Sequence, residues 1–372
     1  MAKIRVLIVE DSSLVRKILK ASFATDDLIE IVDEAEDGKQ GLNKILINSY
    51  DMVLSDYEMP NMTGLEMLQA LKNDKTLKLK PPVIVFSSLT ERGSKQTIDC
   101  LLAGAKDYVA KPSGANTAGA GINEVKVVLK EKILAIVAGQ NSRQLHKVKP
   151  AGESIDNTDS AKAANVDSNP QSSLKPAIIK NLRLVVVGSS TGGPAALEAV
   201  LKELPTNFPF PILITQHMPK MFTTILADTL TKNTNIKVNE VKGPTTLNKG
   251  EAYLASGGIH MVMKDENTVD VEEGPQVNYC IPSVDVLFSS VSKKYPKIKS
   301  ILSIMLTGMG RDGRDGVAEL KKSHNCFSIA QDEESSVVWA MPKAVYEAGL
   351  SDRLLPLDKI GGFMNNVANL NK

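Results

Sequence analysis

Hydrophobic and polar residues alternate between two patterns over the first part of the chain. Short β-branched apolar runs are typical of buried strands, and apolar residues that recur every three or four positions are typical of amphipathic helices. The predicted strands are Ile4–Val9, Ile29–Val32, Met52–Leu54, Val83–Phe86 and Tyr108–Val109. The predicted helices are Ser13–Phe23, Gly41–Ile47, Gly64–Leu71, Ser94–Leu102 and Asn123–Val137. This alternation predicts an α/β domain over residues 1–140, with a parallel sheet of five strands covered on both faces.

The same two patterns return near Asn181 and continue to the end of the chain. The predicted strands are Leu184–Val187, Ile212–Thr215, Ile236–Val241, Ala252–Ala255, Ile301–Leu306 and Phe327–Ala330. The predicted helices are Pro194–Leu204, Met221–Leu230, Ser283–Val291, Gly316–Lys322 and Pro342–Ala348. Two short apolar runs, Val262–Lys264 and Val269–Val271, flank a polar turn and predict an antiparallel hairpin. We therefore expect a second, doubly wound and mostly parallel α/β domain over residues 181–372.

The residues between the two patterns differ in composition. From Asn141 to Pro176, Ser, Asn, Asp, Ala, Lys and Pro dominate, aromatic residues are absent and apolar residues are isolated. Such a segment buries too little apolar surface to offset the entropy lost on ordering. The sequence therefore predicts a flexible linker over residues 141–180.

Charge and composition exclude several classes of protein. The 44 basic and 43 acidic residues nearly cancel, so no charge excess favours a nucleic acid or an anionic membrane surface as partner. The N-terminus becomes acidic too early for a signal peptide, and no apolar run is long enough to cross a bilayer. Cys100, Cys280 and Cys326 are few and widely spaced, which suits neither a disulfide framework nor a zinc site. We expect a cytoplasmic protein.

Polar residues stand where the strands of the first domain end. In parallel sheets, the functional site lies beyond the carboxyl ends of the strands. Three carboxylates that converge there suit Mg²⁺, and a lysine and a hydroxyl suit an added phosphoryl group. A helix cap is the ordinary role of any single acid at such a position, but suitable residues at several strand ends favour a site. These residues are Glu10, Asp11, Asp56, Ser87 and Lys111.

Together these residues resemble the response-regulator receiver family, whose fold is flavodoxin-like. The motifs that carry the resemblance are Glu10-Asp11, Asp56, Glu58-Met59-Pro60, Ser87 and Lys111-Pro112. The resemblance implies that a histidine kinase partner phosphorylates Asp56 and that Glu10, Asp11 and Asp56 hold Mg²⁺. It also implies that Ser87 and Lys111 contact the phosphoryl group. Tyr108 fits the aromatic switch position of the family, although a half-buried strand residue would look the same.

The second domain opens on a glycine-rich turn. The apolar run Leu184–Val187 leads into Gly188-x-Ser190-x-Gly192, and Pro194 begins a helical pattern. This strand–turn–helix context is that of a nucleophile elbow, in which the amide after the serine is placed to face an oxyanion. A turn that binds phosphate at a helix N-terminus is the alternative, but the turn lacks the lysine of a P-loop.

A nucleophilic serine requires a base and an orienting acid. Of the four histidines, His217 directly follows the strand Ile212–Thr215, and His260 is the second candidate. Asp312 lies in a glycine-rich segment after another strand, where a helix cap is the alternative role. Asp285 is better explained as an acid in the first turn of a helix.

These segments resemble the protein-glutamate methylesterases of bacterial chemotaxis. The motifs are GSSTGGP at 188–194, ITQHMP at 214–219, PSVDVLF at 282–288, LTGMGRDG at 306–313 and SSLTERG at 87–93. The resemblance implies that Ser190 is the nucleophile, His217 the base and Asp312 the orienting acid. It implies removal of methyl groups from glutamyl methyl esters of chemoreceptors, release of methanol and deamidation of receptor glutamines. The esterase reaction would need no metal. The alternative function is a phosphorylation-switched module that docks on receptors without catalysis.

Three features depart from the family pattern. Ser189 stands where alanine is expected, so its hydroxyl lies beside the predicted nucleophile. Ile281 precedes Pro282 where a basic residue is usual, and the linker is longer than expected. None of the three changes the predicted catalytic residues.

Overall fold

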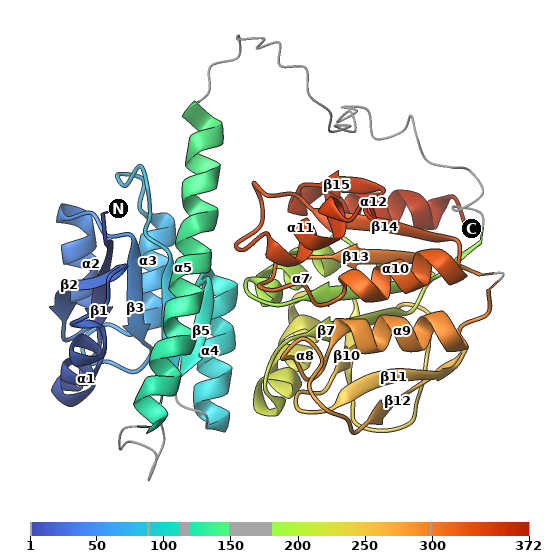
Figure 1. Cartoon of the computed structure of the whole chain (residues 1–372), viewed down its shortest axis with the longest axis horizontal. Helices are drawn as coiled ribbons and strands as arrows, with labels where there is room; N and C mark the ends of the chain where they lie inside the picture. The colour runs from blue at the N-terminus through green and yellow to red at the C-terminus, as the bar shows by residue number, and fades with distance from the viewer. Residues whose placement is uncertain (1, 88–89, 112–119, 149–180, 298, 372) are drawn as a thin grey trace.

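The computed structural model describes residues 2–87, 90–111, 120–148, 181–297 and 299–371. Two α/β units lie side by side, one built on a five-stranded sheet and the other on a seven-stranded sheet (Figure 1). Ser88 and Pro112, which belong to predicted motifs, and residues 149–180 of the predicted linker lie outside the described residues. The division at residues 140 and 181 stays a prediction.

The N-terminal unit has the predicted parallel sheet. Its strand order is β2-β1-β3-β4-β5, and every neighbouring pair is parallel. This order brings the carboxyl ends of β1, β3, β4 and β5 together at one edge. The strands are β1 (Ile4–Val9), β2 (Ile29–Ala35), β3 (Met52–Asp56), β4 (Val83–Ser87) and β5 (Asp107–Ala110).

Five helices cover this sheet, and local capping explains where several of them begin. Ser12, Asp37 and Thr90 each accept a backbone hydrogen bond as N-caps, and Thr63 forms a capping box with Glu66. The helices are α1 (Ser13–Phe23), α2 (Gly38–Ile47), α3 (Gly64–Asn73), α4 (Glu91–Ala103) and α5 (Ala120–Val148).

Helix α5 is longer than the sequence predicts. It continues past Val137 to Val148, into the first residues of the predicted linker. Gly139 and Arg143 explain the extension, because both contact the C-terminal unit. A Cβ on Gly139 would lie 2.8 Å from the Val337 carbonyl oxygen, and the Arg143 guanidinium donates to the Ser336 carbonyl. Such tertiary contacts stabilise a helix where its own apolar pattern fades.

The C-terminal unit has a parallel sheet in the order β15-β14-β13-β6-β7-β10-β8. A three-stranded antiparallel sheet, β11-β12-β9, contains the predicted hairpin. The parallel strands are β6 (Leu182–Ser189), β7 (Ile212–Gln216), β8 (Lys237–Val241), β10 (Glu251–Ala255), β13 (Ser300–Met305), β14 (Cys326–Gln331) and β15 (Arg353–Leu355). The antiparallel strands are β9 (Thr245–Thr246), β11 (His260–Asp265) and β12 (Thr268–Glu272). Because β7 and β13 lie on opposite sides of β6, the strand order reverses there, which is where α/β sheets form their sites.

The helices of this unit include one that the sequence analysis missed. They are α7 (Gly193–Lys202), α8 (Lys220–Asn233), α9 (Val284–Lys294), α10 (Arg314–Ser323), α11 (Ala340–Glu347) and α12 (Leu357–Asn369). Helix α12 buries Ile360, Phe363, Met364 and Val367, but Gly361-Gly362 and three asparagines weaken its helical signal. Its packing against α7 overrides this low propensity.

The two units share an apolar interface. Helix α4 packs against α7 and α8, and the Tyr108 ring of β5 stacks on Phe222 of α8 with centroids 4.6 Å apart. Helices α4 and α5 lie on the side of the N-terminal unit that faces the C-terminal unit (Figure 1). Val338 of the C-terminal unit belongs to the same buried cluster as Ile133 and Ile136 of α5.

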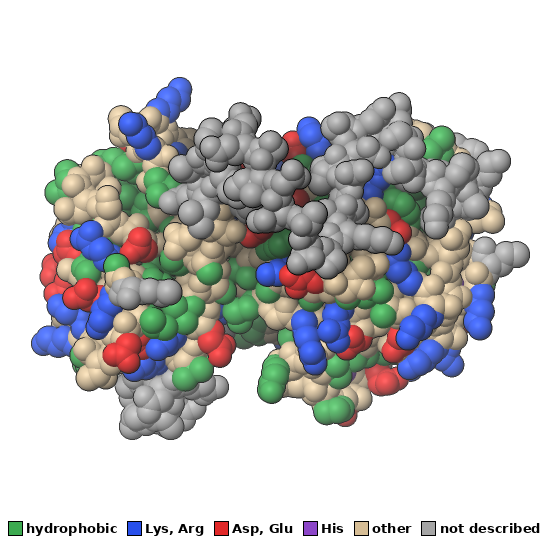
Figure 2. Space-filling model, turned by 45° about the horizontal axis from the view of Figure 1, so that its top comes forward, with side chains coloured by type: hydrophobic (Ala, Val, Ile, Leu, Met, Phe, Trp, Pro, Cys, Tyr) green, Lys and Arg blue, Asp and Glu red, His purple; other side chains and the backbone are tan. Residues whose placement is uncertain are grey.

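The surface is of mixed charge. Basic and acidic side chains are interspersed over the face in Figure 2, in keeping with 44 basic and 43 acidic residues in the chain. In the described part of the chain, each helix is too short or too polar to span a bilayer.

Candidate functional site

Ser190 lies in the tight turn between β6 and α7. Its amide donates to the Thr307 carbonyl at 3.0 Å, and its carbonyl accepts from the Gly193 amide at 2.7 Å. Gly192 has φ +78°, a left-handed conformation that glycine adopts without strain. Within the described residues, the Thr191 amide donates to no acceptor. The turn therefore leaves an N–H group free beside the half-buried serine, as an oxyanion-binding site requires.

His217 and Asp312 form an ion-pair geometry next to this turn. His217 follows β7, and Asp312 lies in the loop between β13 and α10. The Nε2 atom of His217 lies 2.8 Å from Oδ2 of Asp312, and the two side chains are 12% and 2% exposed. The His217 amide donates to the Ser189 carbonyl at 3.1 Å, which ties β7 to the serine turn. The structure thus brings the three predicted catalytic residues to neighbouring strand ends.

The hydroxyl of Ser190 makes no hydrogen bond to His217 in the described part of the chain. Asp312 occupies Nε2 of the imidazole, so Nδ1 is the nitrogen left to accept a serine proton. Catalytic hydrogen bonds commonly tighten only when substrate binds. Gly308 permits the close packing, because a Cβ there would lie 2.9 Å from the Ser190 Cβ.

Asp312 is held by a dense set of donors. It accepts hydrogen bonds from the Ser283 hydroxyl at 2.8 Å, the Val284 amide at 2.6 Å and the Asn278 side chain at 3.1 Å. Burial opposes the charge of this carboxylate, but the hydrogen bond and charge of His217 outweigh it and lower the pKa of Asp312 to about 2. Asp312 is therefore an anion that fixes the imidazole ring at neutral pH.

Asp285 has a different environment and a different role. As expected, it lies in the first turn of α9, where it accepts from the Gly316 amide at 2.6 Å. Burial, and next to it the Asp312 charge, raises the pKa of Asp285 to about 7. Asp285 fixes α10 against α9 and does not contact His217 in the described structure.

Two other histidines, His260 and His324, have structural partners in the described part of the chain. His260, the second candidate for the base, is 3% exposed and has backbone partners at both ring nitrogens, the Pro275 carbonyl and the Ser283 amide. His324 caps the C-terminus of α10 and lies 3.0 Å from the Tyr295 carbonyl. Neither ring is free to act as the base.

Two further residues at the site have roles that the sequence did not predict. The Ser189 hydroxyl is fully buried and donates to the Gln216 side chain at 2.7 Å, so it is not directed towards the predicted catalytic residues. Cys280 places its Sγ atom 3.5 Å from Nδ1 of His217. The only sequence signal for Cys280 is its position just before the Pro282-Ser283 motif, because the contact with His217 is long-range.

The N-terminal unit gathers the predicted phosphorylation residues at one sheet edge. Lys111 Nζ lies 2.9 Å from Glu10 Oε2 and 2.7 Å from Asp56 Oδ2. Ligand oxygens of Glu10, Asp11 and Asp56 lie within 4.8 Å of one another, a donor set that fits a hard divalent cation. Burial, followed by repulsion from Asp56, raises the pKa of Glu10 to about 7.

Ser87 ends β4 beside this cluster, as predicted. It is 2% exposed, and its hydroxyl donates to the Gly93 carbonyl at 3.3 Å and accepts from Thr97 at 2.5 Å. These contacts fix Ser87 against the first turns of α4. A phosphoryl contact would require its hydroxyl to turn towards Asp56.

The two sites are physically linked through β5. Asp107 Oδ2 accepts from the Thr191 hydroxyl at 2.6 Å and pairs with Lys132 of α5 at 2.7 Å. Thr191 follows the predicted nucleophile, so the N-terminal unit contacts the serine turn directly. Asp107 and Thr191 are 5% and 6% exposed, so this contact is sealed from solvent.

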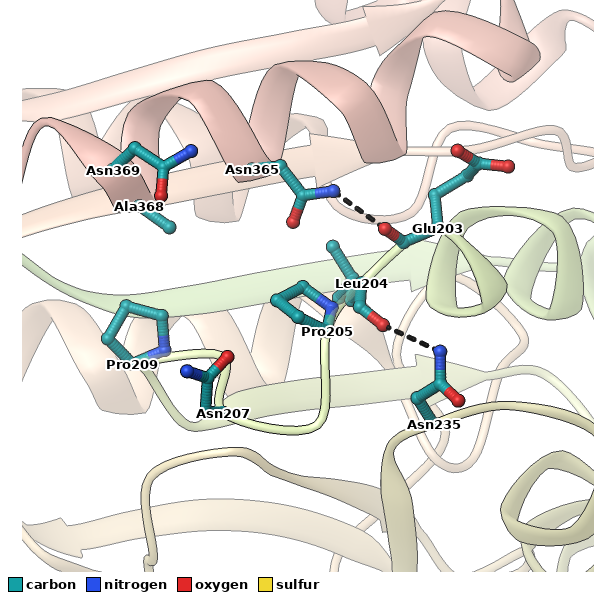
Figure 3. Close-up of a pocket in the computed structure, with 9 residues that line it drawn as sticks. All are labelled: Glu203, Leu204, Pro205, Asn207, Pro209, Asn235, Asn365, Ala368 and Asn369. Atoms are coloured by element: carbon teal, nitrogen blue, oxygen red, sulfur yellow. Dashed lines mark hydrogen bonds between the residues drawn. The ribbon is translucent and has the colours of Figure 1, made fainter.

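A pocket of about 410 Å³ lies elsewhere in the C-terminal unit. Figure 3 shows its lining from the segments after α7 and α8 and from α12, with Asn365 donating to the Glu203 carbonyl and Asn235 to the Leu204 carbonyl. Its lining contains none of the predicted site residues. The candidate site lies instead where Ser190, His217 and Asp312 meet at the carboxyl edge of the seven-stranded sheet.

The architecture is that of a two-domain response regulator, with a receiver-like unit joined to a serine-hydrolase-like unit. Residues 6–120 match the model of the response regulator receiver domain, and residues 185–364 match that of the CheB methylesterase. The chain is 37% identical over 363 residues to the protein-glutamate methylesterase/protein-glutamine glutaminase of Trichodesmium erythraeum, and the match covers 97% of each chain. A Caulobacter vibrioides protein of that name, numbered 2, is 38% identical over 370 residues, which is 98% of this chain and 99% of that protein.

A solved structure also matches. The CheB methylesterase catalytic domain of Thermotoga maritima is 34% identical, with a TM-score of 0.47, and the match covers 51% of this chain and 98% of that chain. By the near full-length matches, the chain belongs to the CheB protein-glutamate methylesterase family.

Proposed function

We propose that the protein is a phosphorylation-regulated hydrolase that removes methyl groups from glutamyl methyl esters of chemoreceptors and deamidates receptor glutamines. The observation that carries the proposal is the His217–Asp312 pair at 2.8 Å beside the Ser190 turn. Family membership supports the same activity, since the relatives are named for both reactions. Methyl-accepting chemoreceptors are then the substrates and the cytoplasm is the place of action.

The esterase mechanism assigns one role to each of three side chains. Ser190 Oγ attacks the ester carbonyl carbon while His217 Nδ1 accepts the serine proton, and Asp312 stabilises the imidazolium through Nε2. The free Thr191 amide donates to the oxyanion of the tetrahedral intermediate. His217 then protonates the departing methoxide, and methanol leaves an acyl-enzyme.

Water completes the cycle. His217 takes a proton from a water molecule, the hydroxide attacks the acyl carbon, and Ser190 leaves with the proton that His217 returns. With a glutamine substrate, the leaving group is ammonia and the acyl-enzyme is the same. Deamidation therefore requires no further side chain.

The N-terminal unit carries the control site. Asp56 accepts a phosphoryl group from a chemotaxis histidine kinase, and Lys111 and Ser87 contact that group. Glu10, Asp11 and Asp56 would hold Mg²⁺, which would neutralise the clustered negative charge when bound. The Asp107–Thr191 hydrogen bond and the Tyr108–Phe222 stack hold this unit over the serine turn, so phosphorylation activates by shifting the packing equilibrium between the units.

The proposal is tested by methanol release from membranes that contain methylated chemoreceptors. Wild type should release methanol, and faster with a small-molecule phosphodonor, whereas Ser190→Ala should release none. Asp56→Ala should retain the basal rate and lose the stimulation. Stimulation that persists in Asp56→Ala would refute the control site. No release from wild type with receptors of several types would favour a docking module without catalysis.

A further inference from the structure

A thiol lies at the imidazole nitrogen of the predicted base that does not face Asp312. Cys280 belongs to the loop between β12 and α9, and its Sγ lies 3.5 Å from Nδ1 of His217. Ligand atoms of His217, Cys280 and Asp312 all lie within 4.8 Å of one another. Thiolate, imidazole and carboxylate are the ligand types of protein-bound Zn²⁺. The wide spacing of the cysteines argues against a zinc site, but Cys280 and His217 are distant in the sequence and meet only in the folded chain.

The Cys280–His217 geometry suits two ligands of one tetrahedral ion. Zinc–sulfur bonds of about 2.3 Å and zinc–nitrogen bonds of about 2.0–2.1 Å place the two ligand atoms about 3.5 Å apart at a tetrahedral angle. The observed Sγ–Nδ1 distance is 3.5 Å. An ion at this position would therefore need little movement of either side chain.

Asp312 completes an arrangement common to zinc-binding histidines. A metal-bound imidazole usually donates its other N–H to a carboxylate, which fixes the tautomer and orients the ring. Here Oδ2 of Asp312 accepts from Nε2 of His217 at 2.8 Å, so the Nδ1 lone pair points away from Asp312. Because Asp312 also accepts from Ser283, Val284 and Asn278, it serves as the orienting anion and not as a direct ligand.

The Asp312 carboxylate beside His217 and Cys280 favours a cation, whereas the Cys280 thiol must lose its proton before it can bind one. Burial, with Asp312 and Asp285 as further causes, raises the pKa of the Cys280 thiol to about 12. Cys280 is therefore a neutral thiol beside the Asp312 anion when no ion is bound. A divalent cation reverses this balance, because it stabilises the thiolate and displaces the thiol proton to solvent.

We propose that Zn²⁺ binds reversibly between the Cys280 thiolate and Nδ1 of His217, with water at the remaining positions, and thereby inhibits the hydrolase. Binding forms one zinc–sulfur and one zinc–nitrogen bond and releases one proton. The bound ion occupies the lone pair that would accept the Ser190 proton. The inhibition rests on the proposed function, whereas the binding itself does not. An ion can reach the site, since both side chains are only partly buried and the neighbouring Tyr279 is 95% exposed.

The full-length protein allows a test that reports sulfur ligation directly. Co²⁺ replaces Zn²⁺ in such sites, and a thiolate ligand gives Co²⁺ an ultraviolet charge-transfer band. We expect wild type to show this band on Co²⁺ addition and to lose it on Zn²⁺ addition. Co²⁺ at the acidic cluster of Glu10, Asp11 and Asp56 gives no such band, since it has only oxygen ligands.

Two cysteine variants separate the site from the rest of the chain. Cys280→Ser should abolish the band, and Cys100→Ala should keep it, because Cys100 is fully buried in the other unit. No band in wild type, or a band that persists in Cys280→Ser, would overturn the proposal.

Alkylation of wild type tests the same site without a variant. Zn²⁺ should protect Cys280 from iodoacetamide, and equal labelling with and without Zn²⁺ would also overturn the proposal.

The inhibitory step is tested separately by methanol release. Zn²⁺ should inhibit wild type, and the half-inhibiting concentration should rise at least about tenfold in Cys280→Ser. Equal sensitivity of the two proteins would refute inhibition through this site. Failure of the proposed function is distinguishable, because the cobalt band would then appear in a protein that releases no methanol.

Discussion

At the residue scale, Asp312 is buried and accepts hydrogen bonds from several donors. Its Oδ2 atom therefore stays in place and orients the imidazole of His217. Asp312→Asn replaces an acceptor with an amide group and removes the charge that stabilises the imidazolium. We expect kcat for methanol release to fall roughly 10³- to 10⁴-fold, as is typical for loss of the orienting acid of a triad. KM should change little, because Asp312 is 2% exposed and acts on the reaction through His217.

Asp315 provides the matched control for this substitution. It lies three positions further along the same segment, is exposed, and pairs with Arg314 at 2.7 Å. Asp315→Asn should leave kcat within about twofold, since exposed ion pairs contribute little. A comparable loss in both variants would mean that the effect is not specific to the His217 contact.

The ionisation of Glu10 makes the stability of the folded protein fall as pH rises. Its pKa is raised from 4.5 to about 7 in the folded protein, by burial first and then by Asp56. The folded state therefore holds a proton that the unfolded state has lost, and stability falls as pH rises from about 4.5 through about 7. Glu10→Gln removes this penalty.

In Mg²⁺-free buffer, Glu10→Gln should raise the free energy of unfolding at pH 8 by on the order of 1 kcal/mol, and by less at pH 5. Urea unfolding at the two pH values measures both differences. The attraction of Lys111 acts only on the ionised form of Glu10 and is already included in the raised pKa, so the comparison between pH values is the decisive quantity. A larger gain at pH 5 than at pH 8 would contradict the assigned pKa shift.

At the scale of elements, replacing either of two adjacent glycines in α12 with alanine should change the stability of the protein in opposite directions. A Cβ on Gly361 would lie 2.5 Å from the Glu203 Cβ of the segment after α7, whereas a Cβ on Gly362 would meet no atom within 4 Å. Gly361→Ala should destabilise the protein by about 1–3 kcal/mol through overpacking. Gly362→Ala should stabilise it by about 0.5–1 kcal/mol through helix propensity. Thermal unfolding of the two variants checks both signs, and a shared sign would contradict the described helix packing.

The elements that the sequence predicts correctly are those whose signal is local. Helix α1 has a cap and an apolar stripe, and its range Ser13–Phe23 equals the prediction. Strand β15 and helix α12 were missed because their stability comes from neighbours in the fold. The same distinction applies to the site: strand ends identify His217, but only the tertiary structure shows that Cys280 lies at its Nδ1 atom and that His260 is occupied by backbone groups.

At the scale of the whole molecule, the contact of β5 with the serine turn makes the activity of one unit depend on the other. Asp107 accepts from Thr191 and from Lys132 with the same oxygen, so it links α5, β5 and the α7 turn. Tyr108, the next residue, stacks on Phe222. The aromatic residue predicted as the switch thus lies in the interface itself, adjacent to the polar contact.

Asp107→Ala removes the hydrogen bond to Thr191 and should loosen the interface. A lost buried hydrogen bond of about 1 kcal/mol shifts a two-state packing equilibrium about fivefold, so we expect basal methanol release to rise by up to about that factor. Stimulation by phosphodonor should shrink in proportion, because part of the shift has already occurred. Asp26→Ala is the matched control: Asp26 also pairs with a lysine of α5, Lys130 at 2.6 Å, but within the N-terminal unit. Equal basal rates in wild type and Asp107→Ala, or an equal rise in both variants, would show that this contact does not restrain the hydrolase.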